Sequence, residues 1–178
     1  METKTIQDKK FSLSIDAKTI QSVVSEIAEK MNKDLASKEV LFIAILNGSF
    51  MFASDLFKKI DLICRVSFVK NSSYDGTQST GEIVQLIGLN EDIKDKTIVI
   101  VEDIVDSGST LNSIVRYLEK SQPSEIKIAT LLFKPEAYKF DQRIDYIGFN
   151  VPNQFVVGYG LDYNGFGRNL ENIYTEID

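Results

Sequence analysis

Residues 97–111 read Thr-Ile-Val-Ile-Val-Glu-Asp-Ile-Val-Asp-Ser-Gly-Ser-Thr-Leu, and this stretch decides the fold. Thr97 to Val101 is the clearest buried strand of the chain, because a continuous β-branched run is typical of a strand covered on both faces. Three carboxylates follow within five positions, and apolar residues then recur at helical spacing from Leu111 to Leu118, with Pro123 just beyond. A buried strand that passes through a polar loop into a helix is typical of α/β proteins.

The flanking segments repeat this alternation. Apolar spacing predicts an amphipathic helix over Asp16 to Leu35, a buried strand over Val40 to Leu46 and a helix over Phe50 to Lys59. Further strands are predicted at Leu62 to Val69, Glu82 to Leu89, Ile126 to Phe133, Tyr146 to Phe149 and Phe155 to Val157. We therefore expect one α/β domain over residues 1–178, with a mostly parallel sheet whose ligands bind beyond the carboxyl ends of the strands.

Composition narrows the chemistry that this domain can perform. The chain has 178 residues, of which 43% are hydrophobic and 26% charged, as is ordinary for a globular protein. It contains no histidine, which excludes histidine triads and histidine-ligated metals. Its single cysteine, Cys64, excludes an internal disulfide. Catalysis must therefore use carboxylates, lysine, tyrosine, hydroxyls or backbone groups, and magnesium is the leading candidate for a metal.

The formal net charge of -6 disfavours binding to nucleic acid, whose backbone is itself anionic. No apolar run approaches the roughly 20 residues that a membrane crossing needs. The first ten residues carry charges of both signs and lack the apolar centre of a secretory signal. We expect a cytoplasmic protein whose partners are small molecules rather than nucleic acids or membranes.

The loop after the strand at residues 97–101 is suited to phosphate. Its Ser107-Gly108-Ser109-Thr110 run opens a helix, where free backbone N–H groups, the helix dipole and three hydroxyls favour an anion. It is not a Walker A loop, because the glycine spacing differs and no lysine follows the last glycine. Simple helix capping is the alternative for an isolated Asp-Ser-Gly, but three acids behind an apolar strand favour a site. Glu102 and Asp103 are expected to bind sugar hydroxyls or a magnesium-bearing diphosphate, and Asp106 to accept a proton.

This stretch resembles the phosphoribosyl diphosphate signature of type I phosphoribosyltransferases, in particular the branch that acts on hypoxanthine and guanine. Further motifs of that branch occur in the same order, at residues 46–50, 73–74, 78–81, 134 and 155–164. The likeness spans roughly residues 8 to 175. It implies a Rossmann-like fold, with a central, mostly parallel sheet flanked by helices and a small hood formed by terminal segments.

The resemblance also implies which residues bind phosphoribosyl diphosphate. They are Leu46, Asn47, Gly48, Ser73, Tyr74, Glu102, Asp103, Ser107, Gly108, Ser109, Thr110 and Arg168. Residues 46–49 would hold the pyrophosphate, across a cis peptide between Leu46 and Asn47. Many relatives carry lysine where this chain has Asn47, so binding there would rest on the backbone. Ser73 and Tyr74 would belong to a lid over residues 72–81 that excludes water, where the alternative is a solvated hairpin tip.

For the purine, the resemblance implies Lys134, Phe155, Val156 and Asp162. Lys134 would donate to the 6-oxo group, which disfavours adenine, although a lysine at a strand end is also an ordinary solvated flank. Phe155 would stack on the base, although such a residue is more often part of the core. Magnesium would be held by Glu102, Asp103 and Asp162.

The implied activity is that of a pentosyltransferase in purine salvage. It would transfer 5-phosphoribose to hypoxanthine and also to guanine, with Asp106 as the catalytic residue. One alternative is a non-catalytic, RNA-binding regulator of the same fold, which the acidic charge disfavours. Another is an enzyme for xanthine or adenine, and nothing in the sequence excludes xanthine. The resemblance further implies a homodimer or homotetramer.

Overall fold

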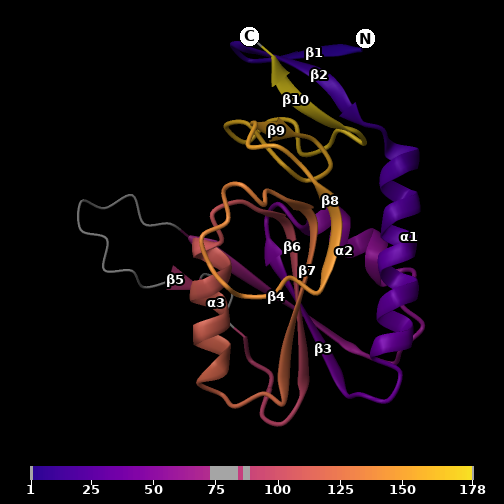
Figure 1. Ribbon diagram of the computed structural model, residues 1–178, viewed down its shortest axis with the longest axis vertical. Helices are drawn as coiled ribbons and strands as arrows, with labels where there is room; N and C mark the ends of the chain where they lie inside the picture. Colours follow the sequence, from indigo (N-terminus) through magenta and orange to yellow (C-terminus); the bar gives the residue numbers. More distant parts are fainter. Residues whose placement is uncertain (1, 73–83, 86–88, 178) are drawn as a thin grey trace.

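The computed structural model describes residues 2–72, 84–85 and 89–177, which form two sheets of different size (Figure 1). The predicted lid, with Ser73 and Tyr74, lies outside the described residues. So does most of the strand predicted over residues 82–89.

The larger sheet has the strand order β5-β4-β3-β6-β7-β8. Five neighbouring strands are parallel, and the short β5 pairs antiparallel with β4 at one edge. The strands are β3 (Val40–Leu46), β4 (Arg65–Ser72), β5 (Val84–Gln85), β6 (Thr97–Val105), β7 (Glu125–Phe133) and β8 (Tyr146–Asn150). This sheet confirms the predicted α/β class and its mostly parallel pairing.

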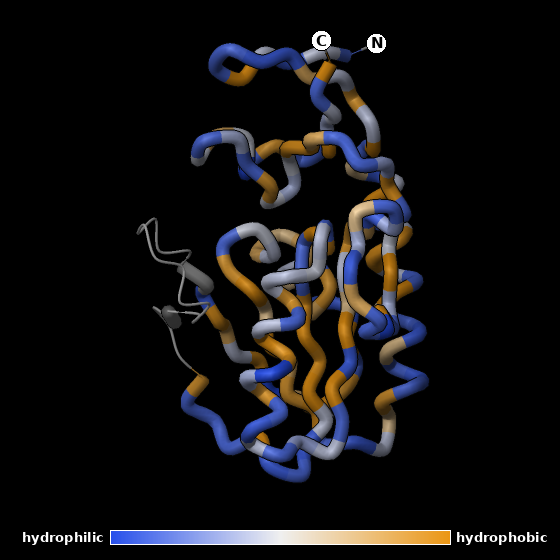
Figure 2. The backbone as a smooth tube through the Cα atoms, turned by 60° about the vertical axis from the view of Figure 1, so that its left-hand side comes forward, coloured by the Kyte–Doolittle hydropathy of each residue, from blue (hydrophilic) through white to orange (hydrophobic). Residues whose placement is uncertain are grey.

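Helices cover both faces of the larger sheet. The helices are α1 (Ala17–Asp34), α2 (Phe50–Phe57) and α3 (Ser109–Glu119). Phe42 and Ala44 of β3 belong to the cluster that includes α1 and α2, whereas Ile43 belongs to the cluster that includes α3. Burial of both faces explains why β3 reads as an unbroken apolar run, and Figure 2 shows the hydrophobic residues concentrated in these strands.

The position of the acidic pair differs from the prediction. We expected Glu102 and Asp103 in the loop after a strand ending at Val101, but β6 continues through both of them to Val105. The reason is the ladder with β7, in which Glu102 faces Thr130 and Val105 faces Phe133. The two carboxylates therefore stand on a rigid strand, and the loop starts only at Asp106.

The hood is a second, antiparallel sheet made from both ends of the chain. Its strands are β1 (Thr3–Ile6), β2 (Lys9–Ile15), β9 (Val156–Val157) and β10 (Ile173–Ile177), in the order β1-β2-β10-β9. Phe11, Val157 and Tyr174 form its buried core. Figure 1 shows the hood above the larger sheet, with both termini in it and the loops around β9 between the two sheets.

The order of the strands reverses at β3, whose carboxyl end lies beside that of β6. The chain goes from β3 to its neighbour β4 and later returns to pair β6 with the other side of β3. In open α/β sheets, ligands bind at such a point of reversal. The loops after β3 and β6 flank it, and the hood lies above it.

Candidate active site

The loop between β3 and α2 is held tightly against two other segments. The Leu46–Asn47 peptide is cis, as the resemblance implied. Ser49 is buried, and its hydroxyl donates to the Ile45 carbonyl at 2.6 Å. A Cβ on Gly48 would lie 1.8 Å from the carboxylate Oδ2 of Asp103, and a Cβ on Gly160 would lie 2.0 Å from the Gly48 carbonyl oxygen. Only glycines allow these approaches, so the loop lies between the acidic pair and the segment after β9.

Glu102 and Asp103 form a carboxylate pair in a poorly solvated place. Glu102 is 7% exposed. Burial raises its pKa well above the ordinary value, and the neighbouring Asp103 charge raises that pKa further. Burial also raises the pKa of Asp103, against an opposing effect from the positive charge of Arg168. A cation, or the hydroxyls of a sugar, would relieve the repulsion between these two groups.

Arg168 and Asp162 close the segment after β9 into a compact turn. The guanidinium Nη2 of Arg168 lies 2.6 Å from Oδ1 of Asp162, and its Nη1 donates to the Gly160 carbonyl at 2.8 Å. The backbone N–H of Gly165 donates to Oδ2 of Asp162 at 2.6 Å. Both carboxylate oxygens of Asp162 therefore have partners within the turn. The structure thus brings together Gly48, Asp103 and Arg168, while Asp162 faces its own turn.

The predicted phosphate cradle is a pocket of about 100 Å³ at the start of α3, lined by residues 104–111 and Glu102. Gly108 adopts a left-handed conformation with φ +81°, and a Cβ there would lie 2.4 Å from the ring of Tyr138. Gly108 is the N-cap of α3 and has no side chain that could cap it. The hydroxyl of Ser107 accepts one long hydrogen bond from the Ser109 N–H at 3.4 Å, so capping accounts for part of this loop. In the described part of the chain no side chain accepts from the Thr110 or Leu111 N–H, and these two groups can donate to an anion.

Asp106 instead contacts the lysine that ends β7. Its Oδ2 lies 2.9 Å from the ammonium of Lys134, and the Lys134 backbone N–H donates to the Val105 carbonyl at 3.0 Å. Lys134 is only 6% exposed, so the alternative of a solvated flank is wrong. The pairing of β6 with β7, with Val105 opposite Phe133, sets the two residues side by side.

The two remaining purine-binding candidates lie in the hood. Val156 is buried in β9, while Phe155 precedes the strand instead of starting it and is 40% exposed. The Phe155 ring packs 6.2 Å from Phe11 and 5.8 Å from Tyr163, with the ammonium of Lys9 5.3 Å from its centroid. In the described part of the chain, no hydrogen bond or ion pair links Phe155 or Val156 with Lys134. Part of the Phe155 ring remains open to a ligand.

Some residues around the site were not predicted. Tyr138 packs against Gly108, and Tyr159 is buried where its hydroxyl donates to Asp55 of α2. The one signal for Asp55 was a carboxylate beside Ser54 in the mostly apolar helix α2. The contact partners of Tyr138 and Tyr159 could not be inferred from local sequence.

Two features are absent from the described part of the chain. Over residues 2–72, 84–85 and 89–177, no three acidic, cysteine or histidine side chains gather as a set of metal ligands. None of the helices in that same part of the chain combines the length and hydrophobicity of a membrane crossing.

Comparison with known proteins identifies the class. The phosphoribosyl transferase domain family matches residues 15–164, and the chain belongs to this family. It is 42% identical over 157 residues to the hypoxanthine-guanine phosphoribosyltransferase of Staphylococcus aureus strain Mu50, covering 88% of each chain.

Solved structures agree with this assignment. A hypoxanthine phosphoribosyltransferase from Staphylococcus aureus superposes with a TM-score of 0.87 at 40% identity, covering 93% of this chain and 91% of that one. A hypoxanthine-guanine phosphoribosyltransferase from Bacillus anthracis gives a TM-score of 0.87 at 36% identity, covering 93% and 98%. The fold is that of the type I phosphoribosyltransferases, as the sequence resemblance implied.

Proposed function

We propose that this chain is a purine-salvage enzyme that transfers 5-phosphoribose from phosphoribosyl diphosphate to hypoxanthine and guanine. The products are inosine or guanosine monophosphate and pyrophosphate. The relatives named as hypoxanthine-guanine phosphoribosyltransferases support this activity.

The contact between Lys134 and Asp106 is the observation that supports a 6-oxopurine as the base that receives the 5-phosphoribose. In a 6-oxopurine, the oxygen at position 6 and nitrogen 7 lie side by side on one edge of the base. Lys134 offers a donor and Asp106 an acceptor only 2.9 Å apart, in a site next to the phosphate pocket. The pair therefore matches an accepting oxygen beside a protonated nitrogen 7. Adenine places an amino group where Lys134 needs an acceptor, so it is disfavoured.

The chemical step follows from this arrangement. Nitrogen 9 of the base attacks the anomeric carbon, the bond from that carbon to the diphosphate oxygen breaks, and Asp106 accepts the proton of nitrogen 7. The run Ser107 to Thr110 holds the 5-phosphate at the start of α3. The loop Leu46 to Ser49 and Arg168 hold the leaving pyrophosphate, while Glu102 and Asp103 accept hydrogen bonds from the ribose hydroxyls. Phe155 and Val156 contribute the hood side of the base site.

Magnesium fits the donor set of this site. Its candidate ligands Glu102, Asp103 and Asp162 offer only carboxylate oxygens. The raised pKa values of Glu102 and Asp103 fit a nearby cation, whereas Asp162 would have to give up a partner in its own turn to bind one. Proteins often hold magnesium with one or two carboxylates together with substrate phosphates, which requires no cluster of three acids. When bound with the diphosphate, the ion supplies positive charge to the leaving group.

Three further properties complete the proposal. Xanthine also presents a 6-oxo group to Lys134, so this contact does not exclude it as a weaker substrate. The chain forms a homodimer or homotetramer, as the family resemblance implies. It acts in the cytoplasm, where its one cysteine, Cys64, needs no disulfide partner.

The test is turnover by the purified protein with magnesium and phosphoribosyl diphosphate. Hypoxanthine, guanine, xanthine and adenine are compared in parallel, with nucleotide formation followed by absorbance and pyrophosphate release measured separately. We expect turnover with hypoxanthine and guanine, less with xanthine and none with adenine. A folded protein that binds phosphoribosyl diphosphate without turning over any base would contradict the enzyme and favour the non-catalytic regulator.

A further inference from the structure

The segment that follows β9 turns around a buried tyrosine. Tyr159 is 2% exposed and has a φ of +48°, between Gly158 and Gly160, which also have positive φ angles. A side chain other than that of glycine is strained in this conformation. The contacts of the Tyr159 side chain therefore have to hold the turn in place.

The tyrosine hydroxyl is tied to the two helices on one face of the larger sheet. It donates to Oδ2 of Asp55 on α2 at 2.7 Å. The amide nitrogen of Gln21 on α1 donates to the same carboxylate and approaches the hydroxyl at 3.4 Å. Lys58 forms an ion pair with the other carboxylate oxygen. Asp55 is thus the centre of a polar cluster in which α1, α2 and the turn after β9 meet.

The protonation states make this contact a charge-assisted hydrogen bond. Burial by itself raises the pKa of Asp55, but the bonds from Lys58, Tyr159 and Gln21 outweigh burial and lower that pKa overall. Burial, and then the Asp55 carboxylate, raise the pKa of Tyr159. Near neutral pH the phenol stays protonated and the carboxylate stays ionised, which is the stronger kind of hydrogen bond.

The backbone on either side of Tyr159 carries parts of the site. The N–H of Tyr159 donates to the Leu170 carbonyl at 2.7 Å, and that of Gly160 donates to the Arg168 carbonyl at 3.0 Å. Arg168 returns a side-chain bond to the Gly160 carbonyl. Gly160 also abuts the Gly48 carbonyl, so any shift of Tyr159 displaces the backbone of Arg168 and the contact with the loop after β3.

We propose that Asp55 and Tyr159 are positioning residues for the diphosphate end of the substrate. They lock the turn that carries Arg168 against the loop that carries Gly48, so that both approach the diphosphate in a fixed geometry. This inference rests on the proposed function. It assigns Asp55 no contact with substrate, and it places the larger effect on the diphosphate side of the site, where Arg168 and Gly48 lie.

The variant Tyr159→Phe keeps the ring and removes the hydroxyl. We expect the KM for phosphoribosyl diphosphate and the Kd for magnesium pyrophosphate, measured by calorimetry, to rise about tenfold. The KM for hypoxanthine should rise less, because Lys134 and Asp106 stand on different elements and Val156 is held in the hood by the pairing of β9 with β10. Asp55→Asn keeps an oxygen that accepts from the hydroxyl and should retain more pyrophosphate affinity than Asp55→Ala.

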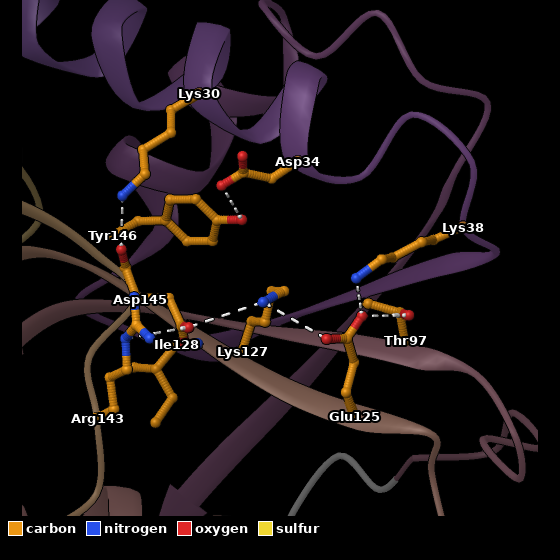
Figure 3. A network of polar contacts seen from close by, with 10 residues as sticks. All are labelled: Lys30, Asp34, Lys38, Thr97, Glu125, Lys127, Ile128, Arg143, Asp145 and Tyr146. Atoms are coloured by element: carbon orange, nitrogen blue, oxygen red, sulfur yellow. Dashed lines mark hydrogen bonds and ion pairs between the residues drawn. The ribbon is translucent and has the colours of Figure 1, made fainter.

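The chain offers a matched control at the other end of the sheet. Tyr146 at the start of β8 is also 2% exposed, and its hydroxyl donates to Asp34 at the end of α1 at 3.2 Å (Figure 3). Burial and the Asp34 charge raise its pKa as well. Tyr146 pairs with Ala129, which lies five residues before Lys134 along β7, or roughly 16 Å for a strand. Tyr146→Phe therefore removes a similar bond far from the site.

The two tyrosine variants separate positioning from stability. We expect both to lower Tm, but only Tyr159→Phe to weaken pyrophosphate and phosphoribosyl diphosphate selectively. Equal effects of Tyr159→Phe and Tyr146→Phe on these constants would overturn the inference, as would equal rises of KM for both substrates. Failure of the wild-type protein to form nucleotide would refute the proposed function instead, so the two failures are distinct.

Discussion

The ammonium of Lys134 lies 2.9 Å from the Asp106 carboxylate and joins two groups to which the sequence resemblance assigned separate roles. Lys134 is buried, whereas the Asp106 side chain is 52% exposed. An ammonium has three donors, so Lys134 can keep Asp106 and still donate to a 6-oxo group. The contact therefore orients the proposed proton acceptor toward the edge of the base that we propose Lys134 recognises.

Replacing Asp106 with asparagine should separate proton transfer from this orienting contact. The amide oxygen still accepts from Lys134, but the amide is a far weaker base than the carboxylate. We expect kcat with hypoxanthine to fall about a hundredfold or more, within the usual range for general base catalysis. The measurement is steady-state turnover together with a thermal unfolding curve.

Asp95→Asn is a suitable control for that loss. Asp95 is exposed in a left-handed turn before β6, at the opposite end of the strand, and asparagine tolerates this conformation. Its turnover should equal that of the wild type. Unchanged kcat in Asp106→Asn would remove Asp106 from the chemistry.

Lys134→Gln should weaken the choice between 6-oxopurines and adenine. A lysine can only donate, whereas a glutamine amide can either donate or accept at position 6. We expect kcat/KM for hypoxanthine to fall about a hundredfold, since a buried charged donor is lost. The ratio of hypoxanthine to adenine activity should fall with it. A ratio equal to that of the wild type would show that selectivity arises elsewhere.

Gly48→Ala should disturb the diphosphate loop, because the new Cβ would lie 1.8 Å from Oδ2 of Asp103. Either the loop or the carboxylate has to move. We expect the KM for phosphoribosyl diphosphate to rise at least tenfold, with a smaller change for hypoxanthine. At Gly165 no atom lies within 4 Å of an added Cβ, and asparagine tolerates its positive φ, so Gly165→Asn is the control. Similar KM values for Gly48→Ala and this control would contradict the role of the loop.

The local pattern of apolar residues was sufficient to predict the main strands of the larger sheet. The apolar run Val40 to Leu46 is β3 to the residue, because burial on both faces leaves no polar position in the strand. The hood strands β1, β2 and β10 were not predicted. The residues of β1 alternate between exposed and partly buried, β2 buries only Phe11 completely, and β10 pairs with β2 across almost the whole chain. Only the family resemblance implied a hood.

The candidate residues of the site could be chosen from the sequence, but the contacts among them could not be predicted from it. The motif around Asp106 indicated phosphate and proton chemistry, and the family resemblance assigned Lys134 to the base, yet their proximity depends on the register between β6 and β7. The extension of β6 through Glu102 likewise depends on pairing with Thr130. Tyr159 and Asp55 lie more than 100 residues apart, and nothing local in either segment indicates the other.

Glu102→Gln should stabilise the fold at neutral pH while impairing the site. Because the folded-state pKa of Glu102 is raised by burial and by Asp103, the folded protein binds this proton more tightly than the unfolded chain does. The resulting stabilisation is complete below the ordinary pKa near 4.5 and is lost as the pH rises through the raised folded-state pKa. At pH 8, well above the ordinary pKa, the wild type must on folding either bury this charge or take up a proton, and the glutamine variant needs neither.

We accordingly expect the Tm of Glu102→Gln to exceed that of the wild type by a few degrees at pH 8, with the difference shrinking toward acidic pH. The exposed Glu119→Gln should show no such difference at any pH, and a pH-independent difference for Glu102→Gln would contradict the assignment. Turnover should fall in the same variant, because the amide accepts the ribose hydroxyls less strongly than a carboxylate does. A gain in stability coupled to a loss of activity would show that the buried charge is retained for the chemistry of the site and not for the fold.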